Sequence, residues 1–178
     1  RVGKTPARFL LDKLRWMNGT YLRAKPHADR VAAARPYLER AGYPLASRSE
    51  AWLEALIDLY AERMETLTQF AQAARFFFVD AVAFDEKAVV DVLRKEGAAA
   101  RLARSREALA ALPAFEAPAI HEALQAVAAA SGCKLGEVAQ PIRVAITGTK
   151  VSPPIDKTLA LLGRETTLAR IEAGLARI

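Results

Sequence analysis

The chain has 178 residues, of which 52% are apolar and only 7% aromatic, and its formal net charge is +6. This apolar fraction excludes a wholly disordered chain, and the shortage of aromatic residues favours helices over strands. No apolar run reaches the ~20 residues of a membrane-spanning helix, and the single cysteine, Cys133, excludes a disulfide framework and favours a reducing compartment. We therefore expect an all-α protein.

The first predicted helix begins near Pro6, and its apolar residues recur at helical spacing until Asn18-Gly19 predicts its end. Pro26 opens a second predicted helix, which Gly42 ends. Ser47-Arg48-Ser49-Glu50 has the spacing of a capping box, in which a serine hydroxyl and a glutamate carboxylate satisfy the first backbone donors of a helix. The apolar residues after it predict the clearest amphipathic helix of the chain, up to about residue 67.

The second half predicts further helices, separated by glycine and proline. Asp85-Glu86 caps a helix whose valines and Leu93 face inward up to Gly97, and an alanine- and arginine-rich helix then runs to about Leu112. The later predicted helices run from about Pro118 to Ser131-Gly132, from Pro141 to Gly148, from a cap at Ser152 to Gly163, and from there to Ile178. A boundary near residues 79–84 then predicts a connector of residues 1–25 and two helical subdomains, residues 26–80 and 81–178.

Charge is segregated along the chain. Residues 1–48 hold 11 Lys/Arg against 3 Asp/Glu (net +8), residues 49–130 hold 8 against 13 (net −5), and residues 131–178 hold 7 against 4 (net +3). Basic segments attract phosphate through counterion release, so two basic ends favour a nucleic-acid partner. Ordinary solvated helix faces are the alternative interpretation.

The sequence offers no candidate catalytic or metal-binding group. It contains no phosphate-cradling Gly-x-Gly-x-x-Gly, and the two histidines, His27 and His121, are too isolated to indicate a metal site or an activated nucleophile. We interpret both as surface or helix-packing residues. Cys133 has no neighbouring base and is interpreted as a small buried hydrophobe.

Three motifs carry a resemblance to a known family. They are the segment Lys13-Leu14-Arg15-Trp16-Met17-Asn18-Gly19-Thr20-Tyr21-Leu22-Arg23, the segment Gln140-Pro141-Ile142-Arg143-Val144-Ala145-Ile146-Thr147-Gly148 with Ser152-Pro153 after it, and the segment Leu161-Leu162-Gly163-Arg164-Glu165 with Arg170-Ile171 after it. Their order and spacing, from about Phe9 to Ile178, resemble the anticodon-binding half of bacterial glutamyl-tRNA synthetases. The resemblance implies an α-helical cage in two lobes, with residues 1–25 as the connector from a stem-contact region.

The resemblance also implies a function. The parent enzyme is a glutamate–tRNA ligase that uses ATP and Mg, and its His-Ile-Gly-His-like and Lys-Met-Ser-Lys-like motifs are absent from this sequence. We expect no catalytic residues, metal or cofactor in this segment, and no catalysis by it alone. The implied partner is tRNA(Glu), with no DNA or membrane, and we expect a cytoplasmic monomer. The alternative is a helical scaffold or protein-interaction module.

By the resemblance, Arg63 contacts the third anticodon base. Glutamate tRNAs present cytosine there, whose O2 and N3 accept from a guanidinium, whereas glutamine tRNAs present guanine, whose N1–H and N2–H₂ are donors. Arginine would therefore favour tRNA(Glu) over tRNA(Gln) by about 1–3 kcal/mol, judged from bidentate base reading elsewhere. The alternative is that Arg63 only pairs with Glu62 or Glu65 on the helix surface.

The resemblance assigns roles to residues outside that segment. Arg143 matches a second arginine that contacts the anticodon, with a bridge between helices as the alternative. Ile155 falls where the family places an apolar residue against an anticodon base, although Pro153-Pro154 replaces the usual Pro-Gly before it. Lys150 is expected to contact phosphate.

In the connector, Lys13, Arg15 and Arg23 are expected to contact the tRNA stem and to position it without reading its sequence. Trp16 and Tyr21 have two interpretations. Their rings are able to stack on bases, but a tryptophan in an amphipathic helix is more often a core residue, and the core interpretation is the favoured one.

Overall fold

The computed structural model describes residues 10–178, and every regular element in that range is helical, which confirms the all-α prediction. The chain divides into two compact units, Arg1–Gln72 and Ala73–Ile178. This division falls earlier than the predicted boundary after residue 80, and it places the predicted connector with the first unit. Within residues 10–178 no helix combines the length and the apolar character needed to cross a bilayer.

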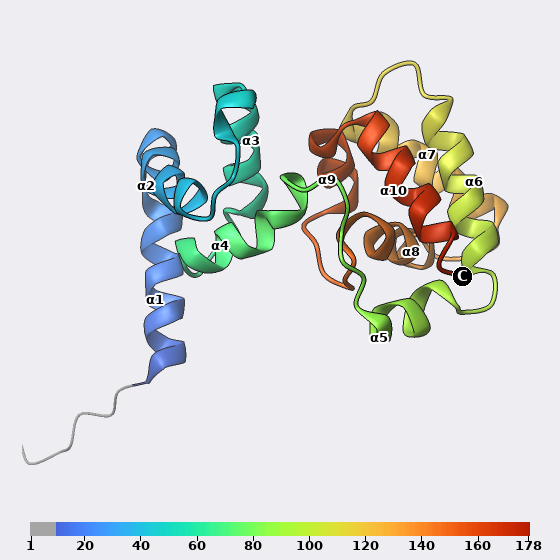
Figure 1. Cartoon of the computed structure of the whole chain (residues 1–178), viewed down its shortest axis with the longest axis horizontal. Coiled ribbons are helices and arrows are strands. Elements are labelled where there is room, and N and C mark those ends of the chain that lie inside the picture. The colour runs from blue at the N-terminus through green and yellow to red at the C-terminus, as the bar shows by residue number, and fades with distance from the viewer. Residues whose placement is uncertain (1–9) are drawn as a thin grey trace, which may run out of the picture. The chain divides into compact units, whose positions relative to one another are not determined.

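The first unit is built from short helices around a small core. Its elements are α1 (Leu11–Ala24), α2 (His27–Arg40), the 3-10 helix η1 (Leu45–Ser47), α3 (Glu50–Tyr60) and α4 (Leu67–Ala73), whose last residue lies at the boundary (Figure 1). Leu38, Leu56 and Phe70 are almost fully buried. The rings of Tyr60 and Phe70 meet edge to face with centroids 5.4 Å apart, which joins α3 to α4.

Two predicted helix ends in this unit are wrong. Asn18-Gly19 does not end a helix, because α1 continues through both residues to Ala24. Gly19 is buried and does not have a positive φ, so its role is close packing rather than a left-handed turn. The predicted start at Pro6 lies outside the described residues. The long helix expected up to residue 67 ends at Tyr60, and a turn of residues 61–66 follows.

The second predicted helix is confirmed, and the capping box is shifted. Pro26 precedes α2, and Gly42 adopts φ +77° just after its end. The cap of α3 is Ser49, whose hydroxyl accepts a hydrogen bond from Trp52 N at 3.2 Å. Ser47 instead donates to the Pro44 carbonyl at 2.9 Å. The box pattern therefore located the helix start to within two residues but named the wrong serine.

The second unit is a larger helical bundle. Its elements are η2 (Ala74–Phe77), α5 (Glu86–Ala88), the short π-helix η3 (Val89–Leu93), α6 (Ala98–Ala110), α7 (Ala117–Ala130), α8 (Leu135–Thr147), α9 (Ile155–Leu162) and α10 (Arg164–Leu175) (Figure 1). Asp85 caps α5 as predicted, by accepting from Lys87 N at 2.9 Å. Val90, however, is 50% exposed and does not face inward.

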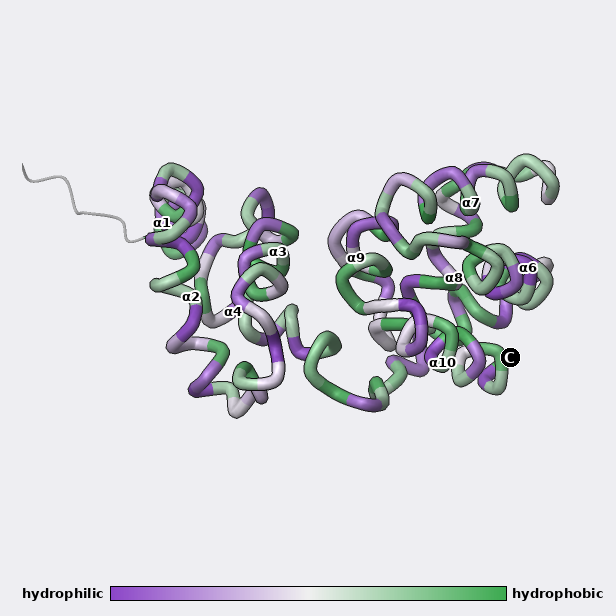
Figure 2. The backbone as a smooth tube through the Cα atoms, turned by 90° about the horizontal axis from the view of Figure 1, so that it is seen from above, coloured by the Kyte–Doolittle hydropathy of each residue, from purple (hydrophilic) through white to green (hydrophobic). Residues whose placement is uncertain are grey.

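Helix α8 is the central element of this unit. It contacts α6, α7, α10 and η3, and Figure 2 shows it lying among neighbouring helices. Eight of its 13 residues are buried, including every residue from Val144 to Thr147. A helix that is apolar on most sides belongs in the interior of a bundle, and α8 therefore provides rigid support for the one arginine that it carries, Arg143.

The predicted start of this helix at Pro141 is wrong, because α8 begins at Leu135 and Pro141 lies inside it. Proline lacks the N–H that would donate to the carbonyl four residues earlier. That carbonyl, on Glu137, instead accepts from Arg101 Nε at 3.3 Å. The predicted end at Gly148 is confirmed, since Gly148 caps α8 with φ +77°.

Hydrogen bonds connect the segment before α5 to the end of α8 and to α10. Asp85 N donates to the Gly148 carbonyl at 2.9 Å. The guanidinium of Arg170, on α10, donates to Ile146 O at 2.7 Å and also to Val79 O. Arg170 is only 4% exposed, and burial lowers the pKa of its guanidinium. This arginine therefore serves the fold and is not available to RNA.

Candidate nucleic-acid interface

Arg63 lies in the turn of residues 61–66 and not on a helix, which corrects the expectation of a helical support. Its side chain is exposed, and its backbone N–H donates to Tyr60 O at 2.9 Å. The next residue, Met64, is 5% exposed and anchors the turn in the core of the first unit. Burial raises the pKa of the Tyr60 hydroxyl, and the positive charge of Arg63 opposes that rise. The turn is thus anchored in the core by Met64 and presents the Arg63 guanidinium at the surface.

Helix α1 packs directly against this turn. Asn18 Nδ2 donates to Glu65 O at 2.6 Å. A Cβ added to Gly19 would lie 3.0 Å from Met64 O and 3.2 Å from Glu65 Cα, so the helix and turn backbones are in close contact. The Arg23 guanidinium borders the same contact, since its Nη1 would lie 3.3 Å from that added Cβ. Sequence reasoning missed this arrangement, because it interpreted Asn18-Gly19 as a helix end.

Arg143 is half-buried on α8 and is held by two neighbours. Its Nε donates to Ser152 Oγ at 2.8 Å, and its Nη1 donates to Gln140 Oε1 at 2.9 Å. Ser152 is buried and donates in turn to the Pro153 carbonyl at 2.8 Å. The predicted cap role of Ser152 is therefore wrong, because the residue before α9 is Pro154 and Ser152 orients Arg143 instead.

The loop that follows α8 is organised by threonine hydroxyls. Thr147 Oγ1 donates to Arg143 O at 2.8 Å and accepts from Thr149 N at 3.1 Å. The loop carries an exposed apolar residue, Val151, at 74%. These hydrogen bonds order the loop after α8, and the loop places Ser152 next to Arg143.

Ile155 packs into the core of the second unit and is 8% exposed. Its buried side chain leaves little surface for a base, so this position gives weak support to the expected anticodon contact. The apolar side chain that this part of the chain does expose is Val151, which the sequence did not single out.

Lys150 is half-exposed and forms an ion pair with Asp91, with Nζ 2.7 Å from Oδ2. The hydrogen bond from Lys150 lowers the pKa of the Asp91 carboxyl. A phosphate that binds Lys150 therefore has to compete with this carboxylate.

A cleft of about 590 Å³ lies beside this pair, and Lys95, Arg101, Gln140 and Lys150 contribute to its lining. Gln140 joins the cleft to Arg143, because its side chain also accepts from that arginine.

Helix α1 presents the predicted stem-contact residues at the surface. Lys13 is exposed, and Arg15 lies 3.9 Å from Asp12 in an ion pair that is open to solvent. The favoured core interpretation of the aromatic residues is wrong for α1, since Trp16 is 60% and Tyr21 is 68% exposed. Both rings are therefore available for contact with another molecule or segment.

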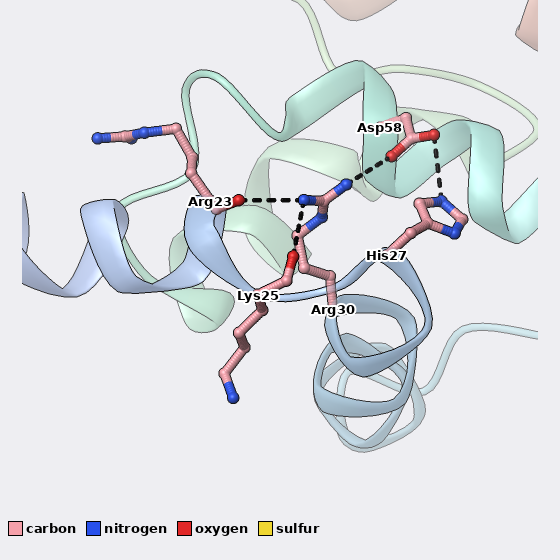
Figure 3. Close-up of polar contacts among 5 residues, drawn as sticks. All are labelled: Arg23, Lys25, His27, Arg30 and Asp58. Carbon is pink, nitrogen blue, oxygen red and sulfur yellow. Dashed lines mark hydrogen bonds and ion pairs between the residues drawn. The ribbon is translucent and has the colours of Figure 1, made fainter.

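A polar cluster joins the end of α1 to α2 and α3 (Figure 3). Arg30 donates to the carbonyls of Arg23 at 3.2 Å and Lys25 at 3.1 Å, and it pairs with Asp58 at 3.3 Å. His27 Nε2 lies 3.1 Å from Asp58 as well. Figure 3 shows the charged ends of Arg23 and Lys25 pointing away from the cluster. Arg30 thus holds the end of α1 while its neighbours direct their charges outward, a division of roles that the sequence did not predict.

The structure also places His121, Cys133 and Arg164, which the sequence analysis named. His121 lies 3.8 Å from Asp156, Cys133 is half-buried, and no group of three or more metal-ligating side chains occurs in residues 10–178. Arg164, from the third family-like motif, donates to the carbonyls of Ala110 and Leu112. Guanidinium groups on the surfaces of both units, Arg63 and Arg143, remain the strongest candidates for base recognition.

Comparison with known proteins defines the class. Residues 29–175 match the protein family described as the anticodon binding domain. This match covers most of the chain, and the protein therefore belongs to that family.

The individual relatives are glutamate–tRNA ligases. The chain is 43% identical over 174 residues to glutamate–tRNA ligase 2 of Coxiella burnetii strain Dugway 5J108-111, covering 96% of this chain and 36% of that protein. It is 44% identical over 182 residues to glutamate–tRNA ligase 1 of Acidithiobacillus ferrooxidans, covering 99% and 38% respectively. The chain thus spans little more than a third of the length of these relatives.

A solved structure agrees with the sequence relatives. The crystal structure of a glutamate tRNA ligase from Elizabethkingia meningosepticum, in complex with its amino acid, superimposes with a TM-score of 0.84 at 26% identity. The superposition covers 98% of this chain and 34% of that chain. Both helical units therefore have counterparts in one region of a ligase.

Proposed function

We propose that this chain is the anticodon-binding part of a glutamate–tRNA ligase and that it selects tRNA(Glu) by contacts with the anticodon. The membership of the anticodon binding domain family carries the proposal, together with relatives that are glutamate–tRNA ligases. In the parent enzyme, glutamate would be joined to tRNA(Glu) with conversion of ATP to AMP and pyrophosphate. ATP and Mg would act in the catalytic part, outside this segment, and the enzyme would act in the cytoplasm as a monomer.

Arg143 would read one anticodon base from the second unit. Two hydrogen bonds, to Ser152 and Gln140, restrict the guanidinium before RNA binds. A side chain that is already ordered loses less conformational entropy on binding, and its planar fork matches acceptor pairs on base edges.

Arg63 would read the third anticodon base from the first unit. Its guanidinium carries only donors, so it would pair with the O2 and N3 acceptors of cytosine and would oppose the donors of guanine. The resulting preference for tRNA(Glu) over tRNA(Gln) is expected to be about 1–3 kcal/mol, or roughly 5- to 150-fold. Lys13, Arg15, Arg23 and Lys150 would contact phosphates, and such contacts position the RNA without reading its sequence.

Binding of tRNA transcripts to the 178-residue chain tests this proposal. The dissociation constant for tRNA(Glu) should be lower than that for tRNA(Gln), and the logarithm of both affinities should fall linearly with the logarithm of salt concentration. Equal and negligible binding of both transcripts would overturn the proposal and favour a protein-interaction module.

Substitution of Arg63 by Gln tests its role in base reading. Two tRNA(Glu) transcripts that differ only in cytosine or guanine at the third anticodon base give the discrimination ratio. Arg63→Gln should lower this ratio more than it weakens binding overall. Arg104→Gln is the matched control, because it removes the same charge from an exposed position on α6 and should leave the ratio unchanged. An unchanged ratio in Arg63→Gln would refute the assigned role.

A further inference from the structure

The contact between α1 and the turn of residues 61–66 is tighter than a surface helix requires. Glycine is among the least favourable helix residues, second only to proline, yet Gly19 lies in the middle of α1 without a positive φ. The backbone of the turn explains its presence, because an added Cβ would lie 3.0 Å from Met64 O and 3.2 Å from Glu65 Cα. Any side chain at residue 19 would press on the turn.

Asn18 fixes the same turn by a hydrogen bond. Its Nδ2 donates to Glu65 O at 2.6 Å, across 47 residues of sequence. On the other side, the backbone N–H of Arg63 donates to Tyr60 O at the end of α3. The backbone of Arg63 is therefore hydrogen-bonded to the end of α3, and the two residues that follow it are in contact with α1.

We propose that Asn18 and Gly19 are positioning residues for base recognition, which set the location of Arg63 by fixing the backbone at Met64 and Glu65. This inference rests on the proposed function of Arg63. A displacement of the turn by a few tenths of an ångström would alter the hydrogen-bond geometry between a guanidinium fork and a base edge, whereas a contact with phosphate tolerates such a shift.

The same helix carries Lys13, Arg15 and Arg23, and Arg23 borders the Gly19 contact. One rigid element would thus hold both the proposed stem contacts and the base-reading turn. A tRNA that is bound along α1 would meet Arg63 at a defined distance from its stem, so base reading would depend on the register of the stem.

The experiment measures the discrimination ratio between cytosine and guanine at the third anticodon base. It uses the full 178-residue chain, four single variants, and the two double variants that combine Arg63→Gln with Asn18→Ala or Gly19→Ala. Asn18→Ala removes the hydrogen bond to Glu65, and Gly19→Ala adds the crowded methyl group. Arg63→Gln removes the reading group itself. Thr20→Ser is the matched control on the same helix, because it keeps the hydroxyl that donates to Trp16 O and accepts from Arg23 and removes only a methyl group from an exposed residue.

Asn18→Ala and Gly19→Ala should each lower the ratio by about threefold to tenfold. This range corresponds to the loss of one well-formed hydrogen bond between the displaced Arg63 guanidinium and the base. Thr20→Ser should leave the ratio unchanged. Gly19→Ala is the more diagnostic variant, since the gain in helix propensity, about 1 kcal/mol, offsets the cost of crowding the turn and should keep the thermal midpoint close to that of the original chain. Combined with Arg63→Gln, neither substitution should lower the ratio further, because coupled residues are not additive.

The outcomes separate the two proposals. If Arg63→Gln lowers the ratio but Asn18→Ala and Gly19→Ala do not, the positioning role is overturned and the proposed function stands. If Arg63→Gln leaves the ratio unchanged, the reading role of Arg63 fails, and the positioning role fails with it. If the Asn18 or Gly19 substitution lowers the ratio equally in the presence of Arg63→Gln, the turn does not act through Arg63 and the inference is wrong.

Discussion

Gly148→Ala should destabilise the second unit far more than an ordinary glycine substitution. Gly148 ends α8 with φ +77°, a left-handed conformation that costs an alanine about 1–2 kcal/mol. An added Cβ would also lie 2.0 Å from Ala83 O, which is backbone and cannot rotate away. Residues 83–85 would have to move, and the hydrogen bond from Asp85 N to Gly148 O, worth about 1 kcal/mol, would be lost. The total is about 3 kcal/mol or more.

The matched control is Gly132→Ala in the same unit. Gly132 also has a positive φ, +61°, but an added Cβ meets nothing within 4 Å. It should therefore lose only the conformational part, about 1–2 kcal/mol. Urea unfolding followed by circular dichroism measures both free energies. An equal decrease in the free energy of unfolding for the two variants would refute the reasoning, since it would mean that the backbone at Ala83 moves aside without a loss of stability.

Two further predictions concern the polar network around Arg143 and Lys150. Because the hydrogen bond from Lys150 lowers the pKa of Asp91, stability from this pair should be present above the ordinary pKa of an aspartate and should be lost as pH falls through the lowered value. An NMR titration of the Asp91 carboxyl checks this, and Lys150→Met should raise its midpoint toward the ordinary value of an aspartate; a midpoint that does not change would contradict the pairing. Ser152→Ala should weaken tRNA binding less than Arg143→Gln does, because it frees the guanidinium without removing it, and equal losses in a filter-binding assay would show that Ser152 has a larger role.

Helix locations followed from the sequence where local chemistry decides them. Asp85 caps α5 through its own carboxylate, and Gly42 and Gly148 follow helix ends in the left-handed conformation that glycine adopts easily. These features involve residues within a few positions of each other, so the order of the sequence contains the information. The all-α class followed in the same way, from composition and periodicity.

Errors arose where distant backbone determines the role of a residue. The Asn-Gly pair at 18–19 has the composition of a helix stop, yet both residues serve a turn 47 positions away. Pro141 has the composition of a helix start, but Arg101 supplies the hydrogen bond to Glu137 O that proline cannot make. In each case a contact with a residue distant in sequence determines the role of the local motif, and the local sequence does not indicate that contact.

The two proposed base-reading arginines differ in how their positions are secured, and this difference has a consequence for selection. The Arg143 guanidinium is hydrogen-bonded by Gln140 on its own helix and by Ser152 in the following loop, both within 9 residues of sequence. The backbone around Arg63 is fixed by α1, the helix that also presents the proposed stem contacts. Substitutions in α1 at its contact with the turn would therefore disturb reading by Arg63 and leave reading by Arg143 intact. Selection at the third anticodon base would thus depend on the contact between α1 and the turn as well as on the base itself.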